Sequence, residues 1–309
     1  MIKNKPVIYI VGPTASGKTA FSIEIAKRFN GEIISGDSMQ IYKGMHIASA
    51  APDEAEKQGV PHHLFEFLSP DEKFSVCEYV KLAKETIAQI HAHNKLPIVV
   101  GGTGLYISAL AQNLDFGSEN GLSGIREELE EQIEKNGLAE LYKYLKTIDP
   151  ISAEKISSND KKRIVRAVEI YKRYGKTKTQ VDEESKEAGA IYDNLFLGLN
   201  YSNREILYDR INQRVDIMLE KGLLAEAEKA YQNIKGTASQ AIGHKEFYEY
   251  LCGNMSFEEA VEHLKMQTRR YAKRQLTWFR RNENINWILM DKEQNPMDIA
   301  YNIVEKFLN

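Results

Sequence analysis

Cysteine is almost missing from this 309-residue sequence, which contains only Cys77 and Cys252. Two cysteines cannot build a disulfide framework or a cysteine-rich zinc site, so we expect a reduced, intracellular setting. A charge excess is missing as well, because 41 Lys and Arg residues are balanced by 44 Asp and Glu residues and the net charge is −3. Any nucleic-acid site must therefore be a local basic patch.

Long apolar runs are also missing, and no stretch approaches the roughly 20 apolar residues that span a bilayer. The apolar run at residues 7–11 follows Lys3 and Lys5, but it is short and leads into a glycine-rich loop, so we interpret it as a strand and not as a signal segment. The remaining composition, 42% apolar and 28% charged, is that of an ordinary globular protein. We expect a cytoplasmic monomer with no membrane partner.

A phosphate-binding loop is the clearest motif. Residues 12–19 have the Walker A pattern G-x-x-x-x-G-K-T, between a strand-like run at 7–11 and a helix-like run at 20–29. The glycines allow consecutive N–H groups to point at one anion, and the helix N-terminus adds partial positive charge. Lys18 supplies a full charge, and the Thr19 hydroxyl can bind Mg²⁺. We therefore predict a diphosphate or triphosphate site formed by Gly12, Pro13, Thr14, Ala15, Ser16, Gly17, Lys18 and Thr19.

Two further strand-like runs end in residues suited to chemistry. The run at residues 32–35 leads to Asp37, and the run at 96–100 leads to the sequence Gly-Gly-Thr-Gly at 101–104. Ligands bind at the carboxyl edge of a parallel sheet, so we expect Asp37 to face the phosphate loop, although Asp is also common in turns. The second run lacks the terminal acid of a Walker B motif, which argues against an ordinary ATPase. The three glycines are expected to let the backbone approach a ligand closely; a plain helix-entry turn is the alternative.

The pattern changes after residue 115. A linker-like stretch at 117–124 opens a region of helical segments with glycine stops and no strand pattern, and strand character returns at 195–199. We therefore predict an α/β fold with a P-loop NTPase-like parallel sheet. The core domain would comprise residues 1–115 and 195–309, and residues 116–194 would form an inserted all-helical domain.

Two predicted helices carry concentrated positive charge. The helix at residues 160–174 begins with three consecutive cations, although positive charge is unfavourable at a helix N-terminus. In the helix at 256–282, cations occupy two adjacent rows, with Arg269, Lys273 and Arg280 in one and Arg270, Arg274 and Arg281 in the other. Charged rows are often only solvated surface. Here the interleaved Tyr271, Trp278 and Phe279 favour an anion-binding face.

Taken together, these motifs resemble the bacterial tRNA dimethylallyltransferase (tRNA isopentenyltransferase) family over nearly the whole chain. The segments that carry the resemblance stand in the family's order at residues 12–19, 37–42, 61–64, 101–106, 159–167, 240–243 and 269–280. The first occurs in many unrelated NTPases, whereas the segments at 37–42 and 269–280 are much more specific.

The resemblance implies transfer of a dimethylallyl group from dimethylallyl diphosphate to the exocyclic amine of the adenosine 3′-adjacent to the anticodon in tRNA. The partners would be dimethylallyl diphosphate and the anticodon stem-loop, and the cofactor would be Mg²⁺ held by Thr19. A Walker B acid is dispensable, because no water is activated. The resemblance also implies three catalytic residues: Asp37 as the base for the amine, Lys18 as a cation for the leaving diphosphate, and Thr103 beside the tRNA.

The family pattern further implies a set of tRNA-binding residues. Those around the target adenine would be Asp37, Ser38, Met39, Gln40 and Thr103. Others would be Arg126, Lys161, Lys162, Arg163, Arg166, Gln240, Gly243, His244, Lys245, Lys273, Arg274 and Arg280. The target base must leave its stack to reach the crevice.

The sequence departs from the family pattern in two places. Members usually have Asp-Ile-Gly-Thr-Ala-Lys-Pro where this chain has His-Ile-Ala-Ser-Ala-Ala-Pro at residues 46–52, so a basic residue is missing at Ala51. His244 stands where many members have tyrosine. Neither change affects the proposed base or the phosphate loop.

Three other functions fit parts of the sequence. A small-molecule kinase of the nucleoside-monophosphate type would turn over ATP and use residues 116–194 as an enlarged lid. A prenyltransferase acting on free adenine nucleotides would not require the helical insertion. A non-catalytic RNA-binding protein switched by nucleotide would tolerate the loss of Asp37.

Overall fold

The computed structural model describes residues 5–114, 124–187, 189–233, 237–292 and 295–309. Within these residues, six parallel strands form one sheet in the order β3-β2-β4-β1-β5-β6. The strands are β1 (Pro6–Val11), β2 (Gly31–Ser35), β3 (His62–His63), β4 (Leu96–Gly101), β5 (Asp193–Asn200) and β6 (Ile285–Leu289). The α/β prediction with a parallel sheet is confirmed.

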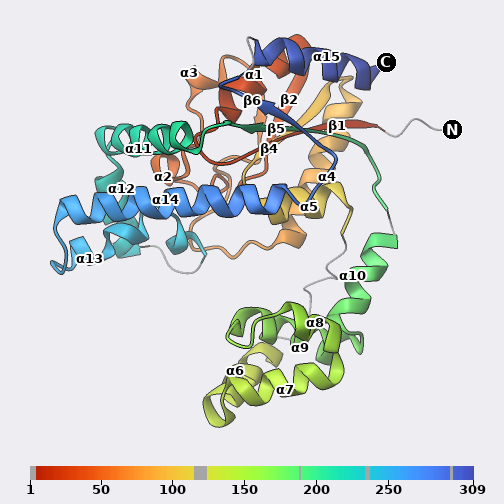
Figure 1. Cartoon of the computed structure of the whole chain (residues 1–309), viewed down its shortest axis with the longest axis vertical. Helices are drawn as coiled ribbons and strands as arrows, with labels where there is room; N and C mark the ends of the chain where they lie inside the picture. Colours follow the sequence, from red (N-terminus) through yellow and green to blue (C-terminus); the bar gives the residue numbers. More distant parts are fainter. Residues whose placement is uncertain (1–4, 115–123, 188, 234–236, 293–294) are drawn as a thin grey trace. The chain divides into compact units, whose positions relative to one another are not determined.

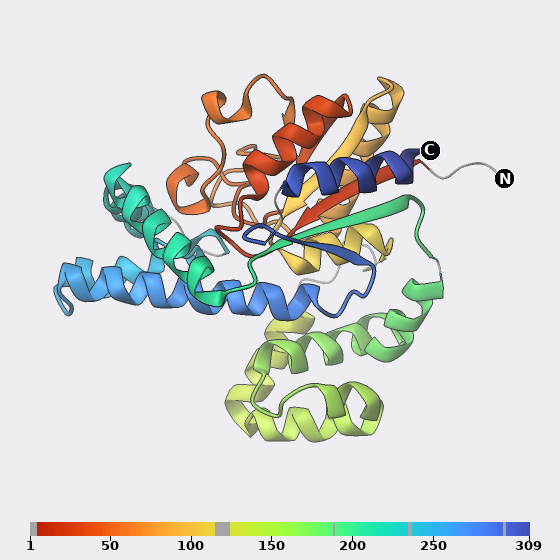
Figure 2. The same ribbon diagram turned by 45° about the horizontal axis from the view of Figure 1, so that its top comes forward.

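Helices cover both faces of this sheet, which explains why its central strands are continuously apolar. On one face lie α1 (Lys18–Arg28) and α15 (Pro296–Leu308), which pack against each other and share one hydrophobic core with Ile8 and Ile33. On the other face lie α4 (Val76–Ala92) and α5 (Gly104–Ala111) (Figures 1 and 2).

The order of the strands creates a crevice at their carboxyl ends. The chain passes from β1 through α1 to β2, but β4 lies between these two strands, while β5 pairs with the other side of β1. The loops after β1, β2 and β4 therefore meet at one edge. Strand-order reversals of this kind are where open parallel sheets bind ligands.

The segment between β2 and α4 is more ordered than its irregular sequence indicates. It contains the short helices α2 (His46–Ser49) and α3 (Glu54–Lys57), followed by β3, which pairs with Ile33 and Ile34. The two histidines of β3 have structural contacts, since His63 Nε2 lies 2.6 Å from Glu32 Oε2. Within the described residues, no cluster of three or more His, Cys, Asp or Glu residues could hold a metal ion.

A helical layer follows β5. It consists of α11 (Arg204–Glu220), α12 (Leu223–Asn233), the 3-10 turns η1 (Ala238–Gln240) and η2 (Lys245–Phe247), α13 (Tyr248–Leu251) and α14 (Phe257–Phe279). Helix α14 begins with a capping box between Ser256 and Glu259, and it packs beside α11 and α5 (Figure 1). Across the part of the chain that the structure describes, no helix is long and apolar enough to cross a membrane.

The chain divides into two compact units, and the second is entirely helical where it is described. We call Met1–Ala111 with Ile191–Asn309 the core unit, and Gln112–Ala190 the helical unit. The helices of the latter are α6 (Ile125–Asn136), α7 (Leu138–Ile148), α8 (Pro150–Lys155), α9 (Lys161–Tyr174) and α10 (Lys178–Glu187). Most of the predicted linker at 117–124 lies outside the described residues, and β5 begins at Asp193 and not at residue 195.

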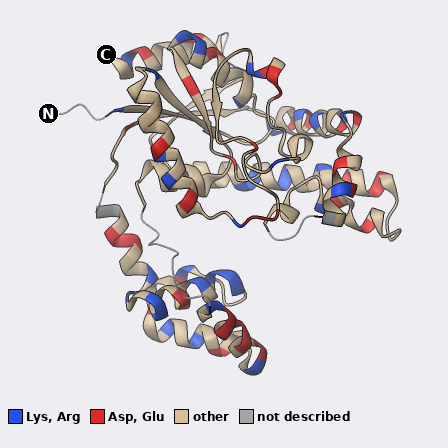
Figure 3. Ribbon diagram, turned by 180° about the vertical axis from the view of Figure 1, so that it is seen from behind, with Lys and Arg blue, Asp and Glu red and all other residues tan. Residues whose placement is uncertain are grey.

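The helical unit has its own small core and an asymmetric charge distribution. Leu129, Leu145, Ile164 and Val168 are fully buried within it. Acidic residues are frequent on α6, whereas α9 carries mostly cations (Figure 3). Asp160 caps α9 by accepting a hydrogen bond from the Arg163 N–H (3.1 Å), which offsets the basic start that the sequence places there.

Candidate active site

The phosphate loop joins β1 to α1 through backbone conformations that favour glycine. Gly12 has φ +147°, and a Cβ there would lie 2.5 Å from the Leu199 carbonyl oxygen, so no other residue fits. Lys18 folds back over the loop, and its Nζ donates to the carbonyls of Gly12 (3.1 Å) and Pro13 (2.7 Å). The amine is thus held at the loop where an anion would sit.

The electrostatic environment of Lys18 favours an anionic ligand. Burial and the nearby Arg214 lower the pKa of Lys18 to about 7, although Asp37 acts in the opposite direction. A bound diphosphate would supply the missing negative charge and favour the protonated amine. The charges of Lys18 and Asp37 each shift the pKa of the other residue, which agrees with the prediction that the two residues face one crevice.

Asp37 is fixed between the ends of β2 and β4. The Met39 N–H donates to Asp37 Oδ1 (2.9 Å), and the Ser38 N–H donates to Thr103 Oγ1 (3.0 Å). Burial raises the pKa of Asp37, while the Met39 N–H and the charges of Lys18 and Arg214 oppose that rise. A carboxylate with a raised pKa is a stronger base than usual, and it lies beside a hydroxyl, Thr103, that points into the same region.

Gln275 connects the phosphate loop to the loop after β4. From α14, its Oε1 accepts from the Thr14 N–H (2.8 Å), and its Nε2 donates to the Gly102 carbonyl (3.0 Å). The side chain is 5% exposed. Tyr271, one turn earlier, forms side-chain hydrogen bonds with Thr103 and Gln275, and burial raises its pKa. The sequence did not single out Gln275 or assign Tyr271 this contact.

The glycines at residues 101, 102 and 104 each lie close to other protein atoms. A Cβ on Gly101 would lie 2.2 Å from the Gly36 carbonyl oxygen, and one on Gly102 would lie 2.0 Å from Gln275 Nε2. A Cβ on Gly104 would lie 2.3 Å from the Trp278 ring. These glycines are needed because β2 and α14 pack directly against the loop.

Two arginines of α11 that the sequence analysis overlooked also face the phosphate loop. Arg210 Nε donates to the Ala15 carbonyl (3.0 Å), and its guanidinium carbon lies 5.4 Å from the centre of the Tyr201 ring. Arg214 is close enough for its charge to shift the pKa values of Lys18 and Asp37, and burial lowers its own pKa. Arg210 and Arg214 are four residues apart and so lie on one face of a helix, which is the sequence feature that could have revealed them.

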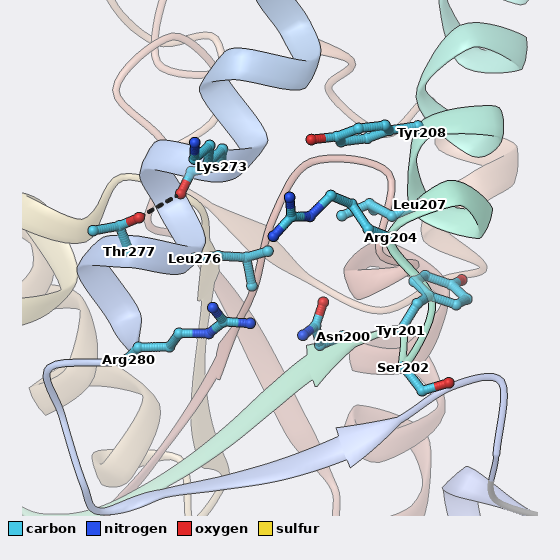
Figure 4. A pocket seen from close by; sticks show the side chains of 10 residues that line it. All are labelled: Asn200, Tyr201, Ser202, Arg204, Leu207, Tyr208, Lys273, Leu276, Thr277 and Arg280. Carbon is cyan, nitrogen blue, oxygen red and sulfur yellow. Dashed lines mark hydrogen bonds between the residues drawn. The ribbon is translucent and has the colours of Figure 1, made fainter.

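The cations in and directly after α14 differ in their surroundings, also within one row. Lys273 and Arg280 line a pocket of about 180 Å³ together with Arg204 of α11, and none of its lining residues is acidic. The guanidinium groups of Arg204 and Arg280 point toward each other across this pocket (Figure 4). In contrast, Arg269 donates to Asn212 Oδ1 (2.6 Å), and Arg274 lies over the Tyr271 ring.

Other residues expected to bind tRNA differ in their exposure. In the helical unit, Arg126, Lys161, Lys162 and Arg163 are exposed, while Arg166 is partly buried and forms an ion pair with Glu169 (3.1 Å). In the core unit, Lys245 and Gln240 are both exposed.

Gly243 and His244, which are also expected to bind tRNA, are buried in this structure. The His244 side chain is 4% exposed, and its Nε2 lies 2.8 Å from Glu226 Oε1. Gln40 also has protein partners at both ends of its amide, since Oε1 accepts from Ser35 Oγ (3.0 Å) and Nε2 donates to the Ser49 and Ala50 carbonyls.

Comparisons with known proteins point to one family. A family model described as IPP transferase matches residues 40–282, and one described as isopentenyl transferase matches residues 5–69. A tRNA dimethylallyltransferase of Acetivibrio thermocellus is 49% identical over 300 residues, covering 96% of this chain and 96% of the relative. Another from Caldanaerobacter subterraneus subsp. tengcongensis is 46% identical over 303 residues, covering 97% and 96%.

Solved structures give the same result. A full-length tRNA isopentenylpyrophosphate transferase from Bacillus halodurans has a TM-score of 0.73 and 44% identity, covering 99% of this chain and 97% of that one. A eukaryotic dimethylallyltransferase acting on tRNA has a TM-score of 0.84 and 32% identity, covering 98% and 79%.

Proposed function

Because the chain belongs to the tRNA dimethylallyltransferase family, we propose that it transfers a dimethylallyl group from dimethylallyl diphosphate to the exocyclic amine of the adenosine 3′-adjacent to the anticodon. The observation that supports this reaction best is the position of Asp37 in the same crevice as Lys18. A base and a diphosphate-binding cation then flank the position where the amine meets the prenyl group.

The proposed step forms one bond and breaks one bond. The amine nitrogen attacks the first carbon of the dimethylallyl group, the bond from that carbon to the diphosphate oxygen breaks, and diphosphate leaves with the electron pair. The amine proton passes to the Asp37 carboxylate, whose raised pKa suits this role. Lys18, Arg214 and the N–H groups of the phosphate loop stabilise the charge that develops on the leaving group.

Thr19 is the residue that would hold Mg²⁺. It is partly buried in the first turn of α1, directly after Lys18, so its hydroxyl is an oxygen ligand at the edge of the diphosphate site. Hard oxygen ligands from the hydroxyl, the diphosphate and water are those that Mg²⁺ prefers. When bound, the ion would neutralise part of the diphosphate charge.

We assign tRNA binding to exposed cations in each unit. Lys161, Lys162 and Arg163 on α9, with Arg126 on α6, would contact RNA phosphates from the helical unit. Lys273 and Arg280 would do so from the pocket beside α11, where the absence of acidic lining residues favours a phosphate group. The adenine would enter beside Asp37, Ser38 and Thr103, where Ser38 and Thr103 are already hydrogen-bonded.

Radiolabel transfer separates this function from its alternatives. The full-length protein is incubated with an anticodon stem-loop, free AMP and Mg²⁺, once with labelled dimethylallyl diphosphate and once with labelled ATP. We expect label in RNA only from the prenyl donor. Label in free adenine nucleotides in preference to RNA would favour the nucleotide prenyltransferase, and ATP turnover would favour the kinase. The kinase is the weaker candidate, because β4 ends in Gly101 and not in an acid.

A further inference from the structure

The largely buried carboxylate of Glu226, whose side chain is 12% exposed, holds the start of α2. Glu226 lies on α12, and its Oε2 accepts from the Ile47 N–H (2.9 Å) while its Oε1 accepts from the Ala48 N–H (2.9 Å). Both N–H groups belong to the first turn of α2, which Met45 leaves without a side-chain cap. The carboxylate therefore caps a helix that is distant from it in the sequence.

The other end of α2 holds Gln40. The Ser49 and Ala50 carbonyls accept from Gln40 Nε2 (3.4 and 3.3 Å), and Gln40 Oε1 accepts from Ser35 Oγ (3.0 Å). Ser35 Oγ in turn accepts from the Asp37 N–H (3.3 Å). A continuous series of hydrogen bonds thus runs from Glu226 through α2 and Gln40 to the backbone of the proposed base.

His244 completes this arrangement with a single hydrogen bond. Its Nε2 lies 2.8 Å from Glu226 Oε1, whereas its Nδ1 is buried and has no partner within the described residues. Burial raises the pKa of Glu226, but His244 and the two N–H groups outweigh that effect, and the pKa is lowered overall. The carboxylate is therefore ionised at neutral pH and accepts three hydrogen bonds on two oxygens.

The two places where the sequence departs from the family pattern meet at this carboxylate. One is the segment 46–51, which contains Ala48, and the other is His244. The two segments also lie side by side, since a Cβ added at Gly243 would lie 3.3 Å from Ala48 Cβ. The two departures belong to one structural unit and are not independent.

We propose that Glu226 and His244 are positioning residues for adenine recognition, which they serve by holding α2 so that its carbonyl groups fix Gln40 beside Asp37. This role rests on the proposed function, because it requires that the adenine binds at residues 37–40. It extends the site to a region of α12 and to the turn before η2. Losing it would impair the reaction with RNA, while the phosphate loop would keep its affinity for diphosphate.

Glu226→Gln tests the carboxylate in the full-length protein. An amide has one acceptor oxygen, so its NH₂ group must face the N–H of Ile47 or Ala48 and release the first turn of α2. We expect kcat/KM for the anticodon stem-loop to fall about 10- to 100-fold, as for other small displacements of a reacting group. The thermal shift induced by pyrophosphate should not change. Glu228→Gln is the matched control, because Glu228 is exposed on the same helix.

The outcomes separate the two proposals. Absence of prenyl transfer by the unsubstituted protein would overturn the proposed function, whereas the ratio of variant to control tests positioning. The positioning role is refuted if Glu226→Gln matches Glu228→Gln in kcat/KM. It is also refuted if Glu226→Gln loses the pyrophosphate shift to the same extent as RNA transfer, since that indicates general disruption.

Replacing His244 tests the single hydrogen bond independently. His244→Phe removes the donor, whereas His244→Tyr supplies a hydroxyl that can donate to Glu226. We expect the Phe variant to lose about tenfold in kcat/KM for the stem-loop, the equivalent of one hydrogen bond to a charged group, and the Tyr variant to recover most of it. Equal activity of the two variants would show that ring volume, and not hydrogen bonding, matters at this position.

Discussion

Replacing Gln275 with leucine removes the side chain that links the phosphate loop to the loop after β4. Leucine is of similar size and stays compatible with the buried face of α14, so the main effect is the loss of the hydrogen bonds to two backbone groups. The Thr14 N–H (2.8 Å) and the Gly102 carbonyl (3.0 Å) lose their partner. Gly102 is buried and Thr14 is partly buried, so water replaces these bonds only in part.

The magnitude follows from these two unpaired groups. An unsatisfied buried polar group costs about 1–3 kcal/mol, so we expect the two groups to cost about 2–6 kcal/mol in the free energy of unfolding. In a unit of this size, each kcal/mol lowers the melting temperature by about 2–4 °C, which predicts a decrease of roughly 4–24 °C. Because Thr14 is part of the loop, the affinity for diphosphate should fall as well.

Thermal unfolding and calorimetric titration with pyrophosphate measure the two effects. Gln275→Glu is the informative second variant, because it keeps an acceptor for the Thr14 N–H but places an oxygen against the Gly102 carbonyl. A change of about 2 °C in the melting temperature corresponds to less than 1 kcal/mol in a unit of this size. If leucine lowers the melting temperature by no more than this and leaves the pyrophosphate affinity unchanged, the link contributes nothing and our reasoning is wrong.

Three further predictions concern the reaction itself. Asp37→Asn should slow single-turnover transfer by about 10²–10⁴ with unchanged diphosphate affinity, whereas an affinity loss rescued by Mg²⁺ would identify a metal ligand. With the raised pKa of Asp37, the transfer rate should fall as the pH decreases through a value above the ordinary carboxyl pKa. Diphosphate affinity should fall as the pH rises above about 7, because Lys18 of the free protein loses its proton there. Binding curves measured across this pH range should show no such dependence for Lys18→Arg. Arg163→Ala and Arg274→Ala should each weaken stem-loop binding and reduce its log–log salt slope by about one, and unchanged slopes would mark them as solvated surface.

The fold was largely predictable because its central strands are buried on both faces. Five of the strands appear in the sequence as short apolar runs, and β1 and β4 consist mostly of buried apolar residues. The strand β3 could not be predicted in this way, since it has only two histidines at the sheet edge. The short helices α2 and α3 lie in a stretch rich in Gly and Pro, and contacts with α12 hold α2 in place.

The candidate site was predictable where a local motif defines it. Lys18 and Asp37 follow strands whose carboxyl ends must share an edge, and their mutual effect on pKa agrees with that expectation. Gln275 and Glu226 have no local signature, because their partners Thr14 and Ile47 are 261 and 179 positions away. Such contacts follow from tertiary packing, which periodicity does not reveal. His244 follows a family motif at residues 240–243, and neither that position nor the residue type predicted its burial and its contact with Glu226.

The missing acid at the end of β4 has a steric reason. Any side chain at Gly101 would collide with the backbone of Gly36, whose carbonyl oxygen would lie 2.2 Å from a Cβ at that position. Gly36 cannot move away freely, because its N–H donates to the Val100 carbonyl (2.7 Å) and its own carbonyl accepts from the Thr103 N–H (3.3 Å). This close packing is what brings Asp37, the next residue, over the end of β4. An acid at residue 101 would therefore displace the acid at residue 37. A site with its carboxylate at residue 37 and none at residue 101 suits proton removal from an amine better than activation of water at a nucleotide phosphate.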